Sequence, residues 1–494
     1  MNVILLEHPR SYGEDRCNDI ANAPLSACLN TGYIGGMLAA HNVEVTIVDG
    51  YLEKLDYPTI EAEIAKIRPT VLGIHLVYHW EDNKTLYQFI ERVKATYGIS
   101  YVSVYGFYPT FAYEEILNRC PAIDAALLGE TELTFLKLVD DFPTIPDMGI
   151  AKRTDNGIVA TRGEVVMDVD SLPFPLRSKG SYSFGEVNIS GSRGCYGGCT
   201  FCYINPYYGD IKRKWRGRSP ENIIAEIDAV MKETDIRYFY FMDPNFYGPG
   251  RAGKDRVLKL ASLLKERQIN FGIEARANDI EDETIKVLVD AGLKHILIGL
   301  ESGRDEALKR LNKLTTVADN EQALQILRKH GIEPSVGFIM FEPDSTLEDL
   351  KVNYDFLKRN ALLDKLEISV NVLYHHMIIL QGSSSYQALQ EQGRLNISKH
   401  STYEADTDYL NPKVAMLAGM LRDMTNHIFS YMKDTWELSF KKDPVILEKY
   451  RLINNLLVQS FEDYLDLLKN EAITTEKRNE YVRTFNQTID HIMS

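Results

Sequence analysis

Three of the six cysteines lie within eight residues, at Cys195, Cys199 and Cys202. Their spacing is C-x3-C-x2-C, and glycines separate the first two cysteines. Glycine permits tight, left-handed backbone, so this spacing lets three thiolates turn onto one compact centre. Thiolates are soft ligands that suit zinc or an iron–sulfur cluster. The segment is therefore the candidate chemical centre of the chain.

Three kinds of cysteine site compete for this segment. A disulfide scaffold fits poorly, because three clustered cysteines is an odd number and the chain is long and not visibly secreted. A structural zinc site usually has four protein ligands, and no second Cys/His cluster follows. A four-iron cluster held by three cysteines leaves one iron open to a substrate or cofactor, which indicates catalysis rather than electron storage. The sequence favours this last kind of site.

The elements that would position the cysteines follow a repeated strand–helix pattern from residue 186 to residue 400. The predicted strands cover residues 187–190, 238–242, 271–275, 295–300, 335–340 and 366–373. Amphipathic helices separate them, such as 221–233, which Ser219 caps. Six consecutive parallel units predict a partial (β/α)6 barrel of the TIM type, with chemistry at the carboxyl ends of its strands.

Polar groups follow four of these strands in order. The sets are Asp243 with Asn245, Glu274 with Arg276, Gly299 with Glu301, and residues 337–343. Together with the cysteine spacing and the aromatic Phe201 before Cys202, this order resembles the radical S-adenosylmethionine (SAM) enzymes. The resemblance implies a [4Fe-4S] cluster bound by the three cysteines, with SAM on the open iron.

The resemblance also implies roles for the residues around SAM. Asp243 and Asn245 would lie near the amino group of its methionine part, and Arg276 would bind the carboxylate, because a guanidinium can fork onto it. Glu301 or Glu274 would accept from the ribose hydroxyls beside Gly299, and Tyr203 would contact the adenine. Tyr207 and Tyr208 are candidate hydrogen-atom donors, and His375 is a candidate for the substrate pocket, each with ordinary packing as the alternative.

The first part of the chain, about residues 1–145, alternates short apolar runs with helical patterns. This predicts a doubly wound, Rossmann-like sheet, which binds ligands at the carboxyl ends of its strands. Two such ends look like binding loops, formed by Gly106, Tyr108, Pro109 and Thr110 and by Gly129 and Glu130. With its G-x-x-P-T and G-E-x-E patterns, the stretch resembles the cobalamin-binding domain that precedes many radical SAM cores.

One departure from that domain leaves two alternatives open. The chain has no D-x-H-x-x-G, the motif that supplies a histidine to cobalt in one type of cobalamin domain. Many cobalamin-dependent radical SAM enzymes lack it as well. The domain therefore either binds cobalamin, through the two loops named above, or has lost its ligand or binds only a partner, because fold alone does not establish function.

Two further regions complete the predicted organisation. Residues 146–185 contain several prolines and are predicted to be a linker with a strand pair at 149–158 and 164–167. Residues 401–494 are predicted to form a helical cap, with helices over 414–434, 444–469 and 475–492. The class is therefore α/β: a Rossmann-like domain, a partial barrel and a helical C-terminal domain.

Composition limits the partners. The net charge of −15 argues against nucleic acid, despite the basic run at 212–218, and no apolar run has membrane-spanning length. Cys17, Cys28 and Cys120 are scattered, which is typical of partly buried thiols in a reducing cytoplasm. The expected partners are a small-molecule substrate and an external reductant such as flavodoxin or ferredoxin, without nucleic acid or membrane.

The resemblance implies an enzyme that cleaves SAM reductively and uses the 5′-deoxyadenosyl radical to abstract hydrogen from an unactivated carbon. The substrate would be a small biosynthetic metabolite, and the favoured outcome is cobalamin-dependent C-methylation. The alternative is radical dehydration, deoxygenation, epimerisation or cyclisation of a sugar-like or other small molecule without cobalamin. No cysteine follows Cys202, so a second cluster is not expected.

Overall fold

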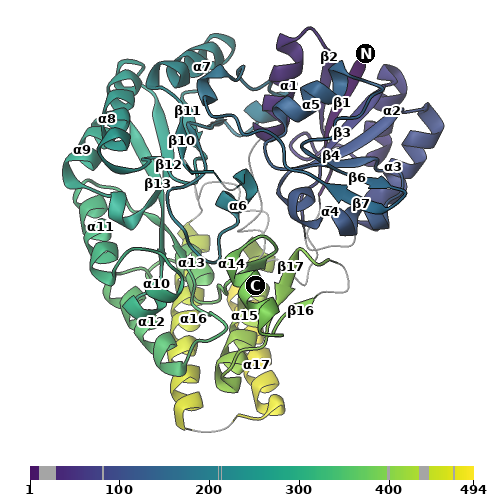
Figure 1. Cartoon of the computed structure of the whole chain (residues 1–494). Helices are drawn as coiled ribbons and strands as arrows, with labels where there is room; N and C mark the ends of the chain where they lie inside the picture. Colours follow the sequence, from purple (N-terminus) through teal and green to yellow (C-terminus); the bar gives the residue numbers. More distant parts are fainter. Residues whose placement is uncertain are drawn as a thin grey trace.

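Figure 1 shows the computed structural model of the chain, with an N-terminal α/β part beside a barrel and a pair of long helices below. The structure describes residues 1–10, 29–79, 83–209, 211–212, 214–397, 401–432, 444–470 and 473–494. Cys17, Cys28 and Arg213, on which sequence expectations fell, lie outside the described residues. Cys120 is buried and free, as expected.

The N-terminal part is a parallel sheet with helices on both faces. Its parallel strands are β1 (Asn2–Glu7), β2 (Glu44–Asp49), β3 (Val71–His75), β4 (Tyr101–Tyr105) and β5 (Ala125–Leu127), in the order β2-β1-β3-β4-β5. Its helices are α1 (Leu29–Ala40), α2 (Tyr57–Ile67), α3 (Lys84–Tyr97), α4 (Phe107–Arg119) and α5 (Glu132–Asp140). The order reverses between β1 and β3, which is where doubly wound sheets bind ligands.

A β-hairpin extends this sheet beyond β5. Its strands β6 (Ile150–Thr154) and β7 (Gly157–Ala160) are antiparallel, and β6 pairs with β5. The expected second strand at 164–167 is wrong, because the chain already turns at Gly157, where φ is 106°. A glycine after an asparagine is typical of a tight hairpin turn, and the two strands with their turn span only residues 150–160.

The central part is a curved, five-stranded parallel sheet. Its strands follow the order β14 (Ser335–Phe338), β13 (Leu293–Glu301), β12 (Asn270–Arg276), β11 (Tyr238–Phe241) and β8 (Val187–Ile189). Its outer face is covered by α7 (Pro220–Glu233), α8 (Gly250–Glu266), α9 (Asp282–Asp290), α11 (Val317–Lys329) and α12 (Leu347–Arg359). Outward residues such as Phe241, Ile273 and Ile298 are fully buried, whereas inward residues such as Tyr240 and Glu274 are half-buried. The predicted partial barrel is confirmed.

The sixth predicted barrel strand is a helix instead. Residues Leu366–Val372 form α13, and the sheet continues only as a parallel bridge between Phe341 and His376. The β-branched residues at 368, 370 and 372 favoured a strand in the sequence. Leu366, Val370 and Leu373 are nevertheless buried at helical spacing, so burial of one helical face determines the structure here.

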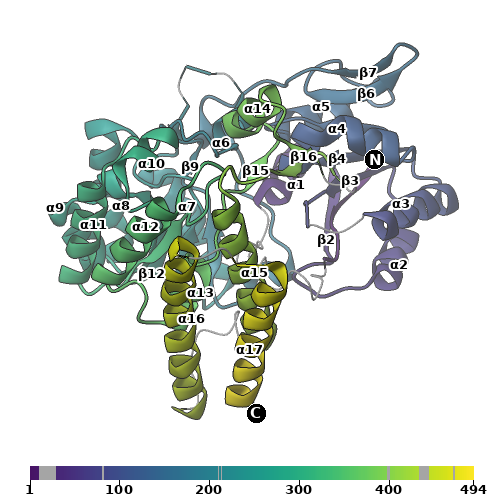
Figure 2. The ribbon, with the colours of Figure 1, turned by 90° about the horizontal axis from the view of Figure 1, so that it is seen from below.

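The C-terminal part consists of α15 (Pro412–Met432), α16 (Pro444–Asn470) and α17 (Thr475–Met493). Figure 2 shows α16 and α17 projecting side by side from the barrel. The ring of Tyr354 on α12 stacks on Phe461 of α16, with centroids 5.2 Å apart. No helix within the described ranges is both long and apolar enough to cross a membrane.

A short segment after the barrel ties it to the N-terminal part. Strand β17 (Glu404–Asp406) pairs with β15 (Ile379–Leu380) and β16 (Asn396–Ile397), close to α14 (Ser384–Glu391). The Oε2 of Glu115 on α4 accepts from the backbone nitrogen of Thr402, at 2.6 Å, and from the hydroxyls of Ser401 and Thr402. Tyr403 is buried in the N-terminal core. We call residues 401–406 the strap.

Candidate functional site

The cysteine loop lies between strand β9 (Ser192–Arg193) and the short helix α6 (Ile204–Tyr208). Asn205 fixes its shape, since its Oδ1 accepts from the backbone nitrogen of Cys195 at 3.1 Å and its Nδ2 donates to the carbonyl of Gly197 at 2.7 Å. Gly194 has a φ of 75°, and a Cβ there would clash with the carbonyl oxygen of Lys214. The loop therefore needs glycine at this position.

The three cysteines of the loop are free and half-buried. Burial raises the pKa of Cys195, and it raises the pKa of Cys202 to about 12. A positive iron centre would stabilise three neighbouring thiolates that burial otherwise disfavours. Within the described residues no three His, Cys, Asp or Glu side chains gather around a point suited to one metal ion. A four-iron cluster gives each thiolate its own iron, so these donors fit it.

A cationic group lies directly against the thiols. Arg276, at the end of β12, places Nη1 3.5 Å from Cys199 Sγ, and its Nη2 donates to the carbonyl of Lys313. Its guanidinium also lies over the ring of Tyr196, 5.4 Å from the centroid. A Cβ at Gly197 would lie 2.5 Å from Nη1, so glycine leaves the room that the guanidinium occupies.

A buried ion pair faces the same region from β13. Lys313 Nζ donates to Glu301 Oε1 at 2.7 Å. Glu301 has a φ of 64°, a left-handed conformation that is strained for a residue with a side chain and that clusters at functional sites. A Cβ on Gly299 would contact this carboxylate and ammonium, so glycine leaves room for the ion pair there. His375 is half-buried near Glu301, and burial lowers its pKa.

The polar residues after β11 are used inside the protein. Asp243 Oδ2 accepts from the backbone nitrogen of Gly191 at 3.1 Å, and burial raises its pKa to about 6. Asn245 Nδ2 donates to Asp279 Oδ2 at 2.7 Å, and its Oδ1 accepts from the backbone nitrogen of Gly248. Both residues are fully buried and brace the loops around the barrel mouth. Their contact with the SAM amino group stays a prediction.

Glu274 points to the inner face of the barrel. Its Oε1 accepts from the hydroxyl of Tyr240 at 3.3 Å, and burial raises its pKa to about 7. Within the described part of the chain it forms no ion pair that would stabilise its negative charge. The carboxyl group is therefore partly protonated near pH 7. Its role toward the ribose of SAM stays a prediction.

The aromatic residues after the third cysteine pack against the N-terminal part. The ring of Tyr203 lies 5.0 Å from Phe107, and the ring of Tyr207 lies 4.2 Å from Phe107. The guanidinium of Arg216 lies 5.2 Å over the ring of Tyr208. Figure 1 shows α6 between the two parts. These contacts give all three tyrosines a packing role, and their predicted roles with adenine and hydrogen atoms stay untested.

The expected binding loop at residues 106–110 is mostly helix, because α4 begins at Phe107. Pro109 lies in its first turn, where proline is well tolerated. Tyr108, Pro109 and Thr110 are buried; the hydroxyl of Thr110 donates to the carbonyl of Gly106 and accepts from the backbone nitrogen of Gly129. The segment is therefore a helix rather than a loop, and Thr110 joins two strand ends. The predicted contact of these residues with cobalamin stays a prediction.

The second expected loop carries a buried ionic network that joins the two parts. Glu130 pairs with Arg216, lies 3.4 Å from Arg193 and accepts from the backbone nitrogen of Val166 at 2.8 Å. Glu132 pairs with Arg193. We call these four charged residues the interdomain clamp. Arg193 and Arg216 flank the cysteine loop in sequence, so the clamp holds the ribbon that carries it. Sequence reasoning named Arg216 only as part of the basic run 212–218 and missed Arg193 and Lys313, because their partners lie far away in the sequence.

Near the β1/β3 switch point, two buried polar atoms have no hydrogen-bond partner among the described residues. Arg10 Nε, after β1, and Asn83 Oδ1, before α3, are buried and make no hydrogen bond with any residue that the structure describes. Glu7 Oε2 accepts from Arg10 Nη2 and lies 3.0 Å from His75 Nδ1, so these three residues of the sheet edge are in contact. Buried polar groups are almost always satisfied, so orphaned atoms near a switch point are typical of a ligand site.

A partial parallel barrel with three free thiols and a guanidinium at its mouth defines a barrel enzyme that works with an iron–sulfur cluster. Residues 189–357, which form the barrel part of the chain, match the radical SAM superfamily. Radical SAM enzymes bind SAM and a [4Fe-4S] cluster, so the sequence prediction of class and of these two cofactors is confirmed.

Some relatives match the chain beyond the barrel. An uncharacterised methyltransferase of Pyrococcus horikoshii is 26% identical over 378 residues, which cover 73% of this chain and 78% of the relative. The anaerobic magnesium-protoporphyrin IX monomethyl ester cyclase of Rubrivivax gelatinosus is 27% identical over 347 residues, 65% of this chain and 60% of the relative. The structure of OxsB, described as a cobalamin-dependent radical SAM enzyme with aqua-cobalamin and SAM bound, aligns with a TM-score of 0.78 at 20% identity, covering 100% of this chain and 78% of that one. This last likeness establishes the fold.

Proposed function

We propose that the protein is a cobalamin-dependent radical SAM methyltransferase that acts on an unactivated carbon of a small metabolite. The observation that carries the proposal is the contact between the carboxyl edge of the N-terminal sheet and the segment after Cys202. Phe107, which follows β4, touches Tyr203 and Tyr207. A cobalamin bound at the carboxyl edge of the N-terminal sheet would therefore face the cluster. Transfer of a methyl group to a substrate radical requires that the two cofactor sites lie next to each other.

The residues near the switch point fit a corrinoid. Cobalamin carries peripheral amide groups that both donate and accept hydrogen bonds. Arg10 Nε offers an unused donor and Asn83 Oδ1 an unused acceptor, both buried. Gly106, with a φ of 117°, brings bare backbone to the same edge. Glu130 and Thr110 are engaged by protein, so we assign the ligand contacts to Arg10 and Asn83 rather than to them.

The protein's own residues bind, orient and exclude water. Cys195, Cys199 and Cys202 would hold the cluster, and Arg276 would neutralise the negative charge beside it. When bound, the cluster and SAM supply a carbon-centred radical and cobalamin supplies a methyl group. The aromatic contacts of α6 close the space between the two parts to water, which protects reactive species from side reactions.

A second candidate is a radical rearrangement or cyclisation without cobalamin. The chain lacks D-x-H-x-x-G, and one relative is named a cyclase. In that case the N-terminal part would act as a structural partner of the barrel.

The test begins with anaerobic reconstitution of the cluster, addition of cobalamin, removal of the excess, and measurement of cobalt and of 5′-deoxyadenosine. Near-stoichiometric cobalt supports the methyltransferase. Cobalt-free protein that still produces 5′-deoxyadenosine supports the second candidate. Cys199→Ala should abolish SAM cleavage and Cys120→Ala, at a buried cysteine outside the loop, should retain it. Cleavage of SAM by a Cys199→Ala variant that keeps an intact cluster would contradict both candidate functions.

The proposal also includes an external reductant and a reducing, cytoplasmic compartment. Free thiols and a low-potential cluster survive best where disulfides do not form.

A further inference from the structure

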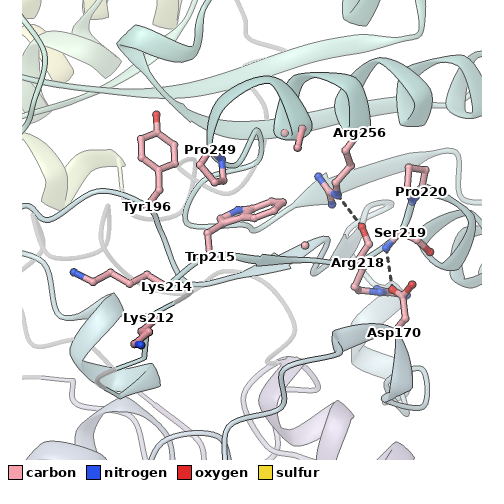
Figure 3. A pocket seen from close by; sticks show the side chains of 13 residues that line it. Asp170, Tyr196, Lys212, Lys214, Trp215, Arg218, Ser219, Pro220, Pro249 and Arg256 are labelled. Carbon is pink, nitrogen blue, oxygen red and sulfur yellow. Dashed lines mark hydrogen bonds between the residues drawn. The ribbon is translucent and has the colours of Figure 1, made fainter.

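A cavity of about 770 Å³ opens beside the cysteine loop. It lies between the first turns of α7 and α8 and the ribbon formed by β9 and β10 (Arg216–Gly217). Figure 3 shows its lining, which includes Tyr196, Lys212, Lys214, Trp215, Arg218 and Arg256. No step of the proposed function uses this cavity.

The cavity is positively charged in a chain whose net charge is −15. Lys212 and Lys214 are exposed at its rim and form no ion pair with any residue that the structure describes. Arg256 donates to the carbonyls of Gly191, Phe246 and Arg218, at 2.6, 3.2 and 2.7 Å, so no carboxylate pairs with it directly. Asp170, the acidic residue of the lining, accepts from the backbone nitrogen of Ser219.

The wall of the cavity is continuous with the cysteine loop. Tyr196 lines the cavity and directly follows Cys195. Its other neighbour is the guanidinium of Arg276, which touches Cys199 Sγ. The backbone of Lys214 lies against Gly194 at the start of the loop. A partner at this rim would therefore come within one residue of a cluster ligand.

The charge distribution suits a protein surface better than an enclosed small anion. In Arg218 and Arg256, every guanidinium nitrogen already donates to a protein atom. The unpaired cations are the two lysines at the rim, on long flexible stems that reach outward. Rim charges of this kind steer an oppositely charged partner and set its association rate.

We propose that Lys212 and Lys214 form the docking surface for an acidic electron-carrier protein, a flavodoxin or ferredoxin, at the cluster. The inference rests on the proposed function, because radical cleavage of SAM consumes an electron. One electron passes from the reduced carrier to the oxidised cluster, the carrier is oxidised by one electron, and no atoms move. Most of the surface of this acidic chain would repel an acidic carrier. The basic rim would therefore direct the carrier to the face next to the cluster.

The experiment compares a charge-reversal variant, K212E/K214E, with K286E/K294E, which changes two exposed lysines elsewhere by the same charge. The rate of 5′-deoxyadenosine formation is measured against the concentration of reduced flavodoxin and, separately, with dithionite. We expect K212E/K214E to need about tenfold more flavodoxin for half of the maximal rate. Its dithionite-driven rate and its rate at saturating flavodoxin should match those of the native protein and of the control.

Three results would overturn the proposal. If K212E/K214E lost the same fraction of its rate with flavodoxin and with dithionite, the lysines would act on the cluster or on SAM. No change with flavodoxin or with ferredoxin would mean that the carrier docks elsewhere. Lysine-dependent binding of single-stranded RNA without any effect on carrier kinetics would assign the rim to nucleic acid. If the native protein cleaved no SAM with dithionite, the proposed function itself would fail. A failure of the docking proposal alone would leave SAM cleavage with dithionite intact.

Discussion

Replacing Glu274 with glutamine tests whether the inner face of the barrel holds a carboxyl group at a cost to stability. Glu274 accepts from Tyr240 and has no cationic partner among the described residues. Burial raises its pKa from 4.5 to about 7. Each tenfold change in proton affinity corresponds to about 1.4 kcal/mol, so ionising this group in the folded protein costs about 3 kcal/mol.

The sign of the pH dependence follows from this pKa. Above pH 7 the group is charged in both the folded and the unfolded chain, and the folded chain bears the full cost. Between pH 7 and 4.5 the folded protein takes up the proton first, so stability on account of this group rises as the pH falls. The glutamine variant has no proton to exchange and loses this dependence.

The measurement is urea unfolding of the native and variant proteins at pH 8 and pH 5. We expect Glu274→Gln to be more stable than the native protein by about 3 kcal/mol at pH 8 and by less than about 1 kcal/mol at pH 5. Glu283→Gln, at an exposed position on α9, should change stability little at either pH. Equal stabilisation at both pH values, or none at pH 8, would refute the reasoning.

Two further substitutions test the contacts around the cysteine loop. Glu130→Gln leaves the buried guanidinium of Arg216 without its charge partner and should lower the free energy of unfolding by about 3 kcal/mol, measured by urea unfolding, whereas Glu63→Gln in an exposed pair should change it by less than 1 kcal/mol. Gly197→Ala places a methyl group where the guanidinium beside Cys199 lies. It should raise the KM for SAM several-fold while the iron content stays unchanged, and loss of iron instead would assign that glycine to the cluster fold alone.

Much of the fold was predictable because its signals are local. The helices of the C-terminal part have long amphipathic stripes, and the barrel strands are short apolar runs bounded by turns. The cysteine spacing located the loop for the same reason, since the three cysteines that would bind one cluster lie within eight residues. Ser219 was recognised as a cap from its place before a proline, and its hydroxyl does accept from the backbone nitrogen of Asn222.

What could not be predicted depends on residues far apart in sequence. Strand composition misled the interpretation of α13, because packing of one helical face outweighed the preference of β-branched residues for strands. Glu130 looked like part of a ligand loop until Arg216, 86 positions later, proved to be its partner. The basic rim also arises only when the loop that carries Lys214 folds against Gly194 and Tyr196.

The strap has a consequence for synthesis of the chain. Tyr403 fills part of the N-terminal core, although the N-terminal sheet ends with β7 at Ala160. At ribosomal rates of about 5–20 residues per second, the strap emerges on the order of 10–50 s after that sheet. During this interval the sheet lacks one of its buried aromatic rings and the carboxylate of Glu115 lacks the strap's donors. Nascent chains stalled before residue 401 should therefore be cut by protease in α4 at rates that the finished protein does not show.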